Sequence, residues 1–153
     1  MKRISENITI EAPPELVWSI LTGFDEYTEW NPYISRVEGE PRVGAKLEVT
    51  FHPPGYRPVT LRPKVLGKRE NRLLRWKGHL LVPGLFDGDH SFSLESANGK
   101  GTRLIQSETL SGLLVPLISG KRLSRIRLGF RFMNQALKER AEQELSNQDE
   151  KQE

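Results

Sequence analysis

Two residues in the second half of the chain carry side chains that could hold or move a proton, His90 and Glu108. His90 alternates with Phe92 in one period-two segment, and Glu108 alternates with Gln106 and Leu110 in the next. Because alternate residues of a strand point to the same face, antiparallel pairing of the two segments would bring the imidazole and the carboxyl together. Such a pair could orient a ligand carbonyl or hydroxyl group, could serve as acid and base, or could be a structural hydrogen bond that satisfies a buried carboxylate.

The segment around His90 is richer in apolar and aromatic residues than a solvated hairpin. Residues 74–94 form two alternating stretches joined through Pro83-Gly84, and Trp76 and Phe92 share the face of His90. Rings with hydrogen-bonding capacity among apolar ones are typical of a cavity wall. The connecting loop is also unusually apolar, which favours either a gate at the cavity mouth or a dimer contact. Its apolar residues are Leu80, Leu81, Val82, Leu85 and Phe86.

Alternation elsewhere in the chain predicts an antiparallel meander. The expected strands span residues 4–11, 34–40, 45–52, 58–69, 72–80, 86–96 and 101–110. Turn-forming Pro, Gly and Asn residues separate most of them. Pro83-Gly84 is the preferred turn before the segment 86–96, and Asp87-Gly88 is the alternative.

Helical patterns interrupt the meander early and follow it at the end. Pro13-Pro14 leads into a first short helix that ends near Thr22, and a second is expected over residues 24–31. Beyond Gly112 the apolar period changes from two to 3.6, which predicts a C-terminal helix of about 20 residues with one narrow apolar stripe. The stripe consists of Leu123, Ile126, Phe130, Met133 and Leu137.

These elements have one economical packing, a curved sheet that grips the long helix and leaves a space between the two. We therefore expect an α+β fold of the helix-grip kind, in which a curved seven-stranded antiparallel sheet wraps around the C-terminal helix. Two short helices lie between the first and second strands. The single domain is expected to span residues 1–144, and the polar, acidic tail at residues 145–153 is expected to be disordered.

Composition limits the classes of function. The chain has 153 residues, of which 36% are hydrophobic, and no apolar run approaches the roughly 18 residues of a membrane-spanning helix. Lys2 and Arg3 lead straight into a strand pattern, so we expect no signal peptide and a cytoplasmic location. The chain contains no cysteine, which excludes disulfides and thiolate chemistry.

The net charge of +3 conceals an uneven distribution. Residues 121–140 contain seven Lys or Arg and one acid, whereas residues 141–153 contain five acids and one Lys. A solvated helix face, partly screened by the acidic tail, is the preferred interpretation of the basic segment. We expect no nucleic-acid partner, because aromatic residues do not interleave with the arginines in the way that base stacking requires.

Metal and nucleotide cofactors are not expected. Asp87, Asp89 and His90 are close in sequence, but alternation places both aspartates on the face opposite His90. No third ligand converges with them, so we predict no metal site. The phosphate-binding and dinucleotide motifs are missing from the sequence.

Three segments give the chain a closer likeness to a known family. They are residues 8–32 (ITIEAPPELVWSILTGFDEYTEWNP), 74–95 (LRWKGHLLVPGLFDGDHSFSLE) and 102–116 (TRLIQSETLSGLLVP). In this order they resemble the START-like, or SRPBCC, superfamily of helix-grip proteins, and within it the polyketide cyclase/dehydrase branch. The resemblance covers about residues 4–141 and implies a deep hydrophobic cavity. Members bind lipids, sterols, polyketides, plant hormones or quinones, and a complete cyclase catalytic set does not map onto this sequence.

Strand and helix parity selects a set of expected ligand-binding residues. They are Trp30, Phe51, Trp76, Phe86, His90, Phe92, Glu108, Leu117, Ile126, Phe130 and Met133. Ordinary core packing is the competing interpretation for the aromatic members.

Three functions remain open at this point. The first is binding of a lipid, quinone or polyketide-like molecule between sheet and helix. The second is a cyclase or dehydratase that uses His90 and Glu108. The third is an interaction module that applies the basic helix to a membrane or a macromolecule.

Overall fold

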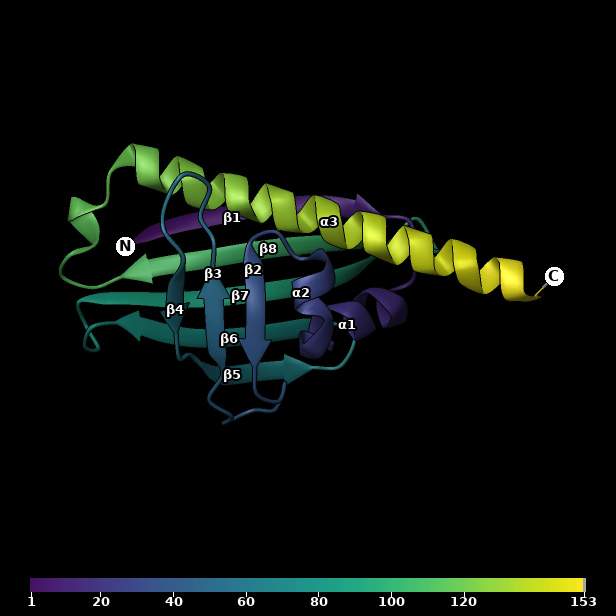
Figure 1. Ribbon diagram of the computed structural model, residues 1–153, viewed down its shortest axis with the longest axis horizontal. Helices are drawn as coiled ribbons and strands as arrows, with labels where there is room; N and C mark the ends of the chain where they lie inside the picture. The colour runs from purple at the N-terminus through teal and green to yellow at the C-terminus, as the bar shows by residue number, and fades with distance from the viewer. Residues whose placement is uncertain (153) are drawn as a thin grey trace.

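The computed structural model describes residues 1–152 and has the α+β architecture expected from the sequence (Figure 1). The strands are β1 (Lys2–Ile10), β2 (Ile34–Glu38), β3 (Glu48–Phe51), β4 (Val59–Leu61), β5 (Lys64–Arg69), β6 (Leu73–Leu80), β7 (Phe86–Ala97) and β8 (Gly101–Ser111). The helices are α1 (Pro14–Thr22), η1 (Phe24–Glu26), α2 (Tyr27–Trp30), η2 (Val115–Leu117) and α3 (Gly120–Gln152). The two short helical segments predicted after the first strand are therefore present.

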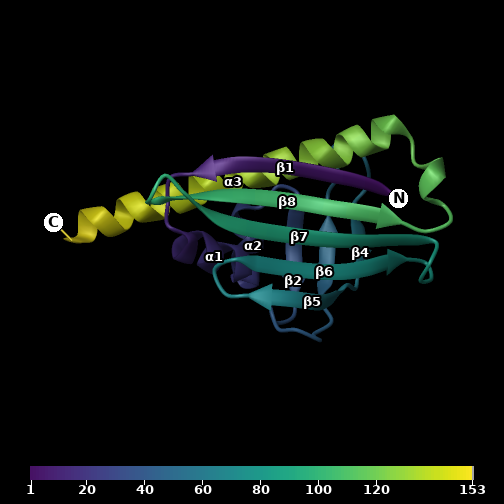
Figure 2. The same cartoon turned by 180° about the vertical axis from the view of Figure 1, so that it is seen from behind.

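The strands form two antiparallel sheets rather than one. The large sheet has the order β1-β8-β7-β6-β5, and the small sheet has the order β2-β3-β4. Helix α3, the short helices and the small sheet all cover the same face of the large sheet, whose other face is uncovered in the view from behind (Figures 1 and 2). The space enclosed between the large sheet, α3 and the small sheet contains the core and the candidate site.

The prediction of seven strands is wrong, because the segment 58–69 is divided into β4 and β5. Pro63 lies between them and has no amide hydrogen for a sheet ladder. The chain changes sheets there, and Leu47 N donates to Pro63 O at 2.8 Å while Val65 N donates to Ala45 O at 2.9 Å. These bonds join the two sheets at a corner. The corner takes the place of the single curved sheet that was expected from the sequence.

The hairpin between β6 and β7 uses the Pro83-Gly84 turn that the sequence favoured. Gly84 has a φ of 91°, a conformation that glycine adopts at little cost. The side chain of Asp87 accepts hydrogen bonds from Gly84 N at 3.0 and 3.2 Å. Asp87-Gly88, the alternative turn, instead belongs to β7.

Helix α3 is longer than expected. It contains 33 residues, and Phe130, Met133 and Leu137 of the predicted stripe are completely buried. The chain stays helical to Gln152, which differs from the disorder expected over the polar tail; residue 153 lies outside the described residues. Side-chain pairs four residues apart support this solvated stretch, including Lys138 with Glu142 and Gln143 with Asn147.

Close packing fixes the position of α3 against the small-sheet side of the molecule. Gly129 is buried, and a Cβ atom built there would lie 2.3 Å from Cδ1 of Tyr33. The Tyr33 ring also packs edge-on against Phe130, with 5.7 Å between the ring centroids. The helix can approach this closely only because position 129 has no side chain.

We expect Gly129→Ala to lower the free energy of unfolding by about 1–3 kcal/mol through overpacking, even though Ala favours a helix over Gly by about 1 kcal/mol. Urea unfolding followed by circular dichroism measures the change. Gly120→Ala is the control, since its Cβ meets no atom within 4 Å. A Gly129→Ala protein as stable as the parent would contradict the close contact between α3 and Tyr33.

Candidate functional site

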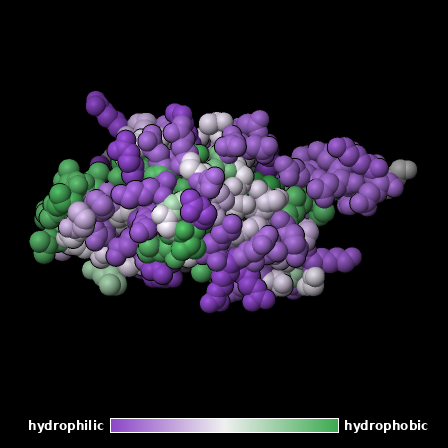
Figure 3. All heavy atoms as spheres, turned by 90° about the horizontal axis from the view of Figure 1, so that it is seen from below, coloured by the Kyte–Doolittle hydropathy of each residue, from purple (hydrophilic) through white to green (hydrophobic). Residues whose placement is uncertain are grey.

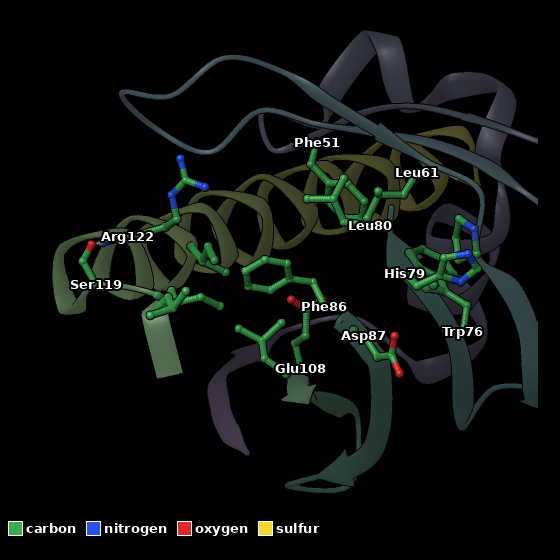
Figure 4. A pocket seen from close by; sticks show the side chains of 17 residues that line it. Phe51, Leu61, Trp76, His79, Leu80, Phe86, Asp87, Glu108, Ser119 and Arg122 are labelled. Carbon is green, nitrogen blue, oxygen red and sulfur yellow. Dashed lines mark hydrogen bonds between the residues drawn. The ribbon is translucent and has the colours of Figure 1, made fainter. Parts of the chain in front are cut away.

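Two adjoining pockets open between the large sheet, the start of α3 and the small sheet, and Figure 4 shows the side chains that line the first of them. Their volumes are about 360 Å³ and about 390 Å³. Both are lined by Phe51, Leu61, Glu108, Arg122 and Ile126, so they meet along these residues. Each volume lies in the range of small-molecule sites, which is about 300–1,000 Å³.

The first pocket lies toward the β6–β7 end of the sheet. Most of its wall is apolar, and its remaining lining residues are Pro63, Trp76, Gly78, His79, Leu80, Phe86, Asp87, Gly88, Leu110, Leu117, Ile118 and Ser119. The second pocket lies under the β3–β4 connection and adds Tyr33, Pro53, Tyr56, Arg57 and Val59.

Two glycines keep the wall of the first pocket open. Gly78 and Gly88 are cross-strand partners in β6 and β7. A Cβ atom at Gly88 would contact the Glu108 carboxyl at 3.6 Å, and one at Gly78 would contact Pro63 at 3.2 Å. A side chain at position 88 would therefore fill space next to the carboxyl, and one at position 78 would press against Pro63.

Six of the eleven predicted lining residues border the pockets: Phe51, Trp76, Phe86, Glu108, Leu117 and Ile126. The other five, Trp30, His90, Phe92, Phe130 and Met133, line neither pocket. Parity gave the correct face for His90, Phe92, Phe130 and Met133, but the space between sheet and helix is filled with side chains at their level, where each is at most 1% exposed. Trp30 instead packs against Tyr27 on α2, with 5.1 Å between ring centroids.

His90 lies directly behind the pocket, in an aromatic cage. Its ring centroid is 4.7 Å from that of Phe92, 5.1 Å from that of Phe130 and 5.5 Å from that of Trp76. The register pairs His90 with Glu108 across β7 and β8, as the alternation predicted. The imidazole Nδ1 lies 3.0 Å from Glu108 Oε2, and Nε2 lies 2.9 Å from Gln106 Oε1.

A chain of hydrogen bonds continues from His90 into the helix. Gln106 Nε2 donates to Asn134 Oδ1 at 2.8 Å, and Asn134 Nδ2 donates to the backbone oxygen of Glu6 at 3.4 Å. The chain therefore joins β7, β8, α3 and β1 through groups that are almost all buried.

The last member of this chain fixes its direction. A backbone carbonyl can only accept, so Asn134 presents its amide nitrogen to Glu6 and its oxygen to Gln106. Gln106 then presents its own oxygen to His90, and the imidazole Nε2 must be the donor. One further proton lies between Nδ1 and Glu108, which makes the pair either imidazolium with carboxylate or imidazole with carboxylic acid.

Besides the Arg122 guanidinium, the Glu108 carboxyl is the charged group that lines both pockets. Its side chain is 14% exposed, whereas His90 behind it is 1% exposed. Burial, followed by the nearby charge of Glu108, raises the pKa of Tyr33 well above its usual value, so this phenol stays protonated. Tyr33 lines the second pocket, which therefore offers a hydroxyl group as well as the carboxyl.

Several polar residues at the pockets were missed by the sequence analysis, among them Arg122 and His79. The Arg122 guanidinium lies over the Tyr56 ring, 4.5 Å from its centroid, and Arg122 lines both pockets. Its spacing of four residues from Ile126 puts both on one helix face, a signal that could have found it. His79 borders the first pocket at the end of β6, although no partner for it was evident from the sequence.

The two aspartates near His90 in sequence make hydrogen bonds elsewhere, Asp89 to Arg75 and Asp87 to the β6–β7 turn. Asp89 accepts two hydrogen bonds from Arg75, at 2.8 and 2.6 Å, and these bonds lower the pKa of its carboxyl. Asp87 accepts from Gly84 N, as described above. Asp89 therefore points away from His90, as its parity predicted.

Comparison with known proteins identifies the family. A sequence profile of the family described as polyketide cyclase / dehydrase and lipid transport matches residues 1–146. The chain belongs to this family. The likeness to the START-like superfamily proposed from the three sequence segments is thereby confirmed.

Individual relatives of this polyketide cyclase/dehydrase family member include plant receptors. The chain is 33% identical over 106 residues to the abscisic acid receptor PYL10 of Arabidopsis thaliana, which is 67% of the chain and 52% of the receptor. It is 32% identical over 83 residues to the abscisic acid receptor PYL7 of the same plant, 53% of the chain and 36% of that receptor. The match thus spans about half of these receptors or less.

Solved structures of low sequence identity share the fold. A START superfamily protein from Mycobacterium smegmatis has a TM-score of 0.73 at 20% identity, over 92% of this chain and 97% of that one. The Zhui aromatase/cyclase from Streptomyces sp. R1128 has a TM-score of 0.72 at 15% identity, over 94% and 95% of the two chains. These likenesses establish the helix-grip fold of the polyketide cyclase/dehydrase family member.

The direction of the hydrogen-bond chain is open to a direct test. We expect Nε2 of His90 to carry a proton in the folded protein at neutral pH, because Gln106 presents an oxygen to it. Long-range ¹H–¹⁵N correlation spectra of the imidazole measure this. The exposed His52 and His79 serve as internal controls. An unprotonated Nε2 on His90 would show that the chain runs in the opposite direction.

Proposed function

We propose that this protein binds a hydrophobic or amphipathic small molecule, such as a lipid, a quinone or a polyketide-like compound, between the sheet and α3. The observation that carries the proposal is a single carboxyl, Glu108, set in the shared wall of two largely apolar pockets. Apolar walls favour an apolar ligand, and the Glu108 carboxyl at their junction offers a hydrogen-bond partner to a hydroxyl or carbonyl group of that ligand.

The neighbours of Glu108 support this arrangement. Phe51, Leu61 and Ile126 give apolar contact on both sides of the carboxyl. His90 holds one carboxyl oxygen through its Nδ1 at 3.0 Å. The other oxygen has no protein partner among residues 1–152, which leaves it available to a ligand.

The relatives are consistent with binding without turnover. The plant relatives are named as receptors for abscisic acid, a small molecule. By analogy, we propose that recognition of a ligand is sufficient for this chain. The expected cytoplasmic location and the expected lack of a nucleic-acid partner stay predictions.

The His90–Glu108 pair also favours a second candidate, a cyclase- or dehydratase-type enzyme. A carboxyl backed by an imidazole can take a proton from a carbon next to a carbonyl and return it elsewhere. The aromatase/cyclase among the structural neighbours bears the name of that chemistry. In this case Glu108 would touch the substrate, and His90 would be a positioning residue behind it.

Two probes of matched shape test the binding proposal. We expect 2-naphthol to bind about five- to tenfold more tightly than naphthalene, because its hydroxyl can bond to Glu108 in either protonation state, and one such bond is worth about 1–1.5 kcal/mol. Titration calorimetry measures both affinities. Glu108→Leu should abolish the difference, and equal affinities in the parent protein would exclude Glu108 as the polar contact.

The Glu108→Gln variant separates binding from catalysis. Gln can still accept from His90 and bond to a hydroxyl, but it cannot take up a proton. For a binding protein we expect 2-naphthol affinity within about threefold of the parent. For an enzyme, Glu108→Gln would abolish turnover of its substrate while keeping that affinity.

Filling the pocket should remove binding without unfolding the protein. Ile126→Trp adds bulk where the two pockets meet, so we expect loss of both naphthol and naphthalene binding, with the free energy of unfolding within about 1–3 kcal/mol of the parent. Leu66→Trp, on β5 outside both pockets, is the matched control and should bind normally. If the Ile126→Trp protein still bound both probes, the binding site would have to lie outside these two pockets.

A further inference from the structure

One end of the molecule presents a group of exposed aliphatic side chains, which we name the apolar tip. It consists of Leu81 and Val82 in the β6–β7 loop together with Leu113 and Leu117 near η2, and their exposed fractions are 73%, 53%, 81% and 76%. Figure 3 shows hydrophobic residues gathered at the left end of the molecule, the end that carries η2 in Figure 1. Exposed apolar residues that form one contiguous patch mark an interaction surface more often than scattered ones do.

Backbone hydrogen bonds hold the two loops of the apolar tip together. Leu113 N donates to Gly84 O at 2.9 Å, and Leu114 N donates to Leu85 O at 3.1 Å. Gly112 is required for this approach, because a Cβ at that position would lie 2.3 Å from Leu85 O. These bonds hold the β6–β7 loop and the segment around η2 side by side, so the tip is a defined part of the folded surface.

Leu81 is held outward by an unusual backbone conformation. Its φ is 72°, in the left-handed region that leucine rarely adopts. Such strained residues cluster at functional sites. A conformation that keeps a leucine in solvent brings no folding advantage and favours a role in contact with something apolar.

Basic residues surround the apolar tip. Lys121 and Arg125 follow it on α3, and neither has an ion-pair partner among residues 1–152. Lys2 reaches the same end of the molecule, where its Nζ donates to Ile118 O at 3.0 Å. The sequence contains no Asp or Glu from residue 112 to residue 138, so this stretch carries only positive side chains, and the nearest acid in the other loop is Asp87, whose carboxyl accepts from Gly84 N.

We propose that the apolar tip docks on the surface of a bilayer that contains anionic lipid. Inserted aliphatic side chains and adjacent basic residues are the two contributions that together give interfacial binding. A protein partner fits less well, because the tip offers no aromatic residue, and such residues anchor protein interfaces. No described helix is long and apolar enough to cross a bilayer, so the proposed contact is with its surface.

The apolar tip lies next to the first pocket. Leu80 and Leu117 belong to the end of the molecule that carries the tip, and both line the first pocket, as does Arg122. Docking would therefore set the pocket mouth against the membrane, where an apolar ligand could pass without crossing water. Docking itself does not depend on the proposed function, and it can be measured with the pocket empty.

Co-sedimentation with vesicles tests the proposal. We expect the protein to sediment with vesicles of phosphatidylcholine containing about a third phosphatidylglycerol, and at least about tenfold less with phosphatidylcholine alone or at high salt. Leu113→Ser with Leu117→Ser, and separately Lys121→Gln with Arg125→Gln, should each weaken binding by about tenfold or more. Leu66→Ser with Lys68→Gln, on β5 outside the tip, is the control and should bind like the parent.

Three results would overturn docking. The first is no sedimentation of the parent protein with anionic vesicles, and the second is equal sedimentation of the tip variants and the control. The third is a parent protein that does not bind vesicles but forms a dimer in analytical ultracentrifugation, with the Leu113→Ser, Leu117→Ser variant monomeric. Circular dichroism confirms that each variant folds. Glu108→Leu should keep vesicle binding while it loses the preference for 2-naphthol, so failure of the pocket proposal and failure of docking are distinguishable.

Discussion

The structure depends on one chain of buried hydrogen bonds, which runs from Glu108 through His90, Gln106 and Asn134 to the backbone of β1. In a low-dielectric interior each bond in such a chain matters, because an unpaired polar group there is costly. The chain fastens α3 to the sheet from inside. It also ends at the pocket, so the same bonds that position the helix aim one carboxyl at the space where we propose that a ligand binds.

This arrangement divides the gap between sheet and helix into two parts. On one side of His90, the rings of Phe92 and Phe130 pack closely and leave no space for a ligand. On the other side, Gly78 and Gly88 leave the wall bare and the pockets begin. A closely packed core thus lies behind the pockets, and the proposed ligand touches only Glu108 of the buried hydrogen-bond chain.

The sequence predicted most of the fold for physical reasons that hold locally. Alternation and turn residues gave the strands, their neighbours and the meeting of His90 with Glu108. The division at Pro63 was missed because alternation continues across a chain that changes sheets. Parity also says which face a side chain occupies but not whether neighbouring side chains fill the space, so Phe92, Phe130 and Met133 were expected at the pocket and lie in the core. Arg122 was missed although its spacing of four residues from Ile126 indicates a shared helix face, and His79 was missed because its strand parity places it opposite Trp76 and Gly78.

The central claim is that a guest occupies the space beside Glu108. A crystal structure of the protein with 2-naphthol tests it most directly. The account predicts the rings between Phe51, Phe86 and Ile126, with the hydroxyl oxygen about 3 Å from a Glu108 oxygen. Naphthol bound elsewhere, or side chains closed over the pocket with the carboxyl turned away from it, would contradict the account.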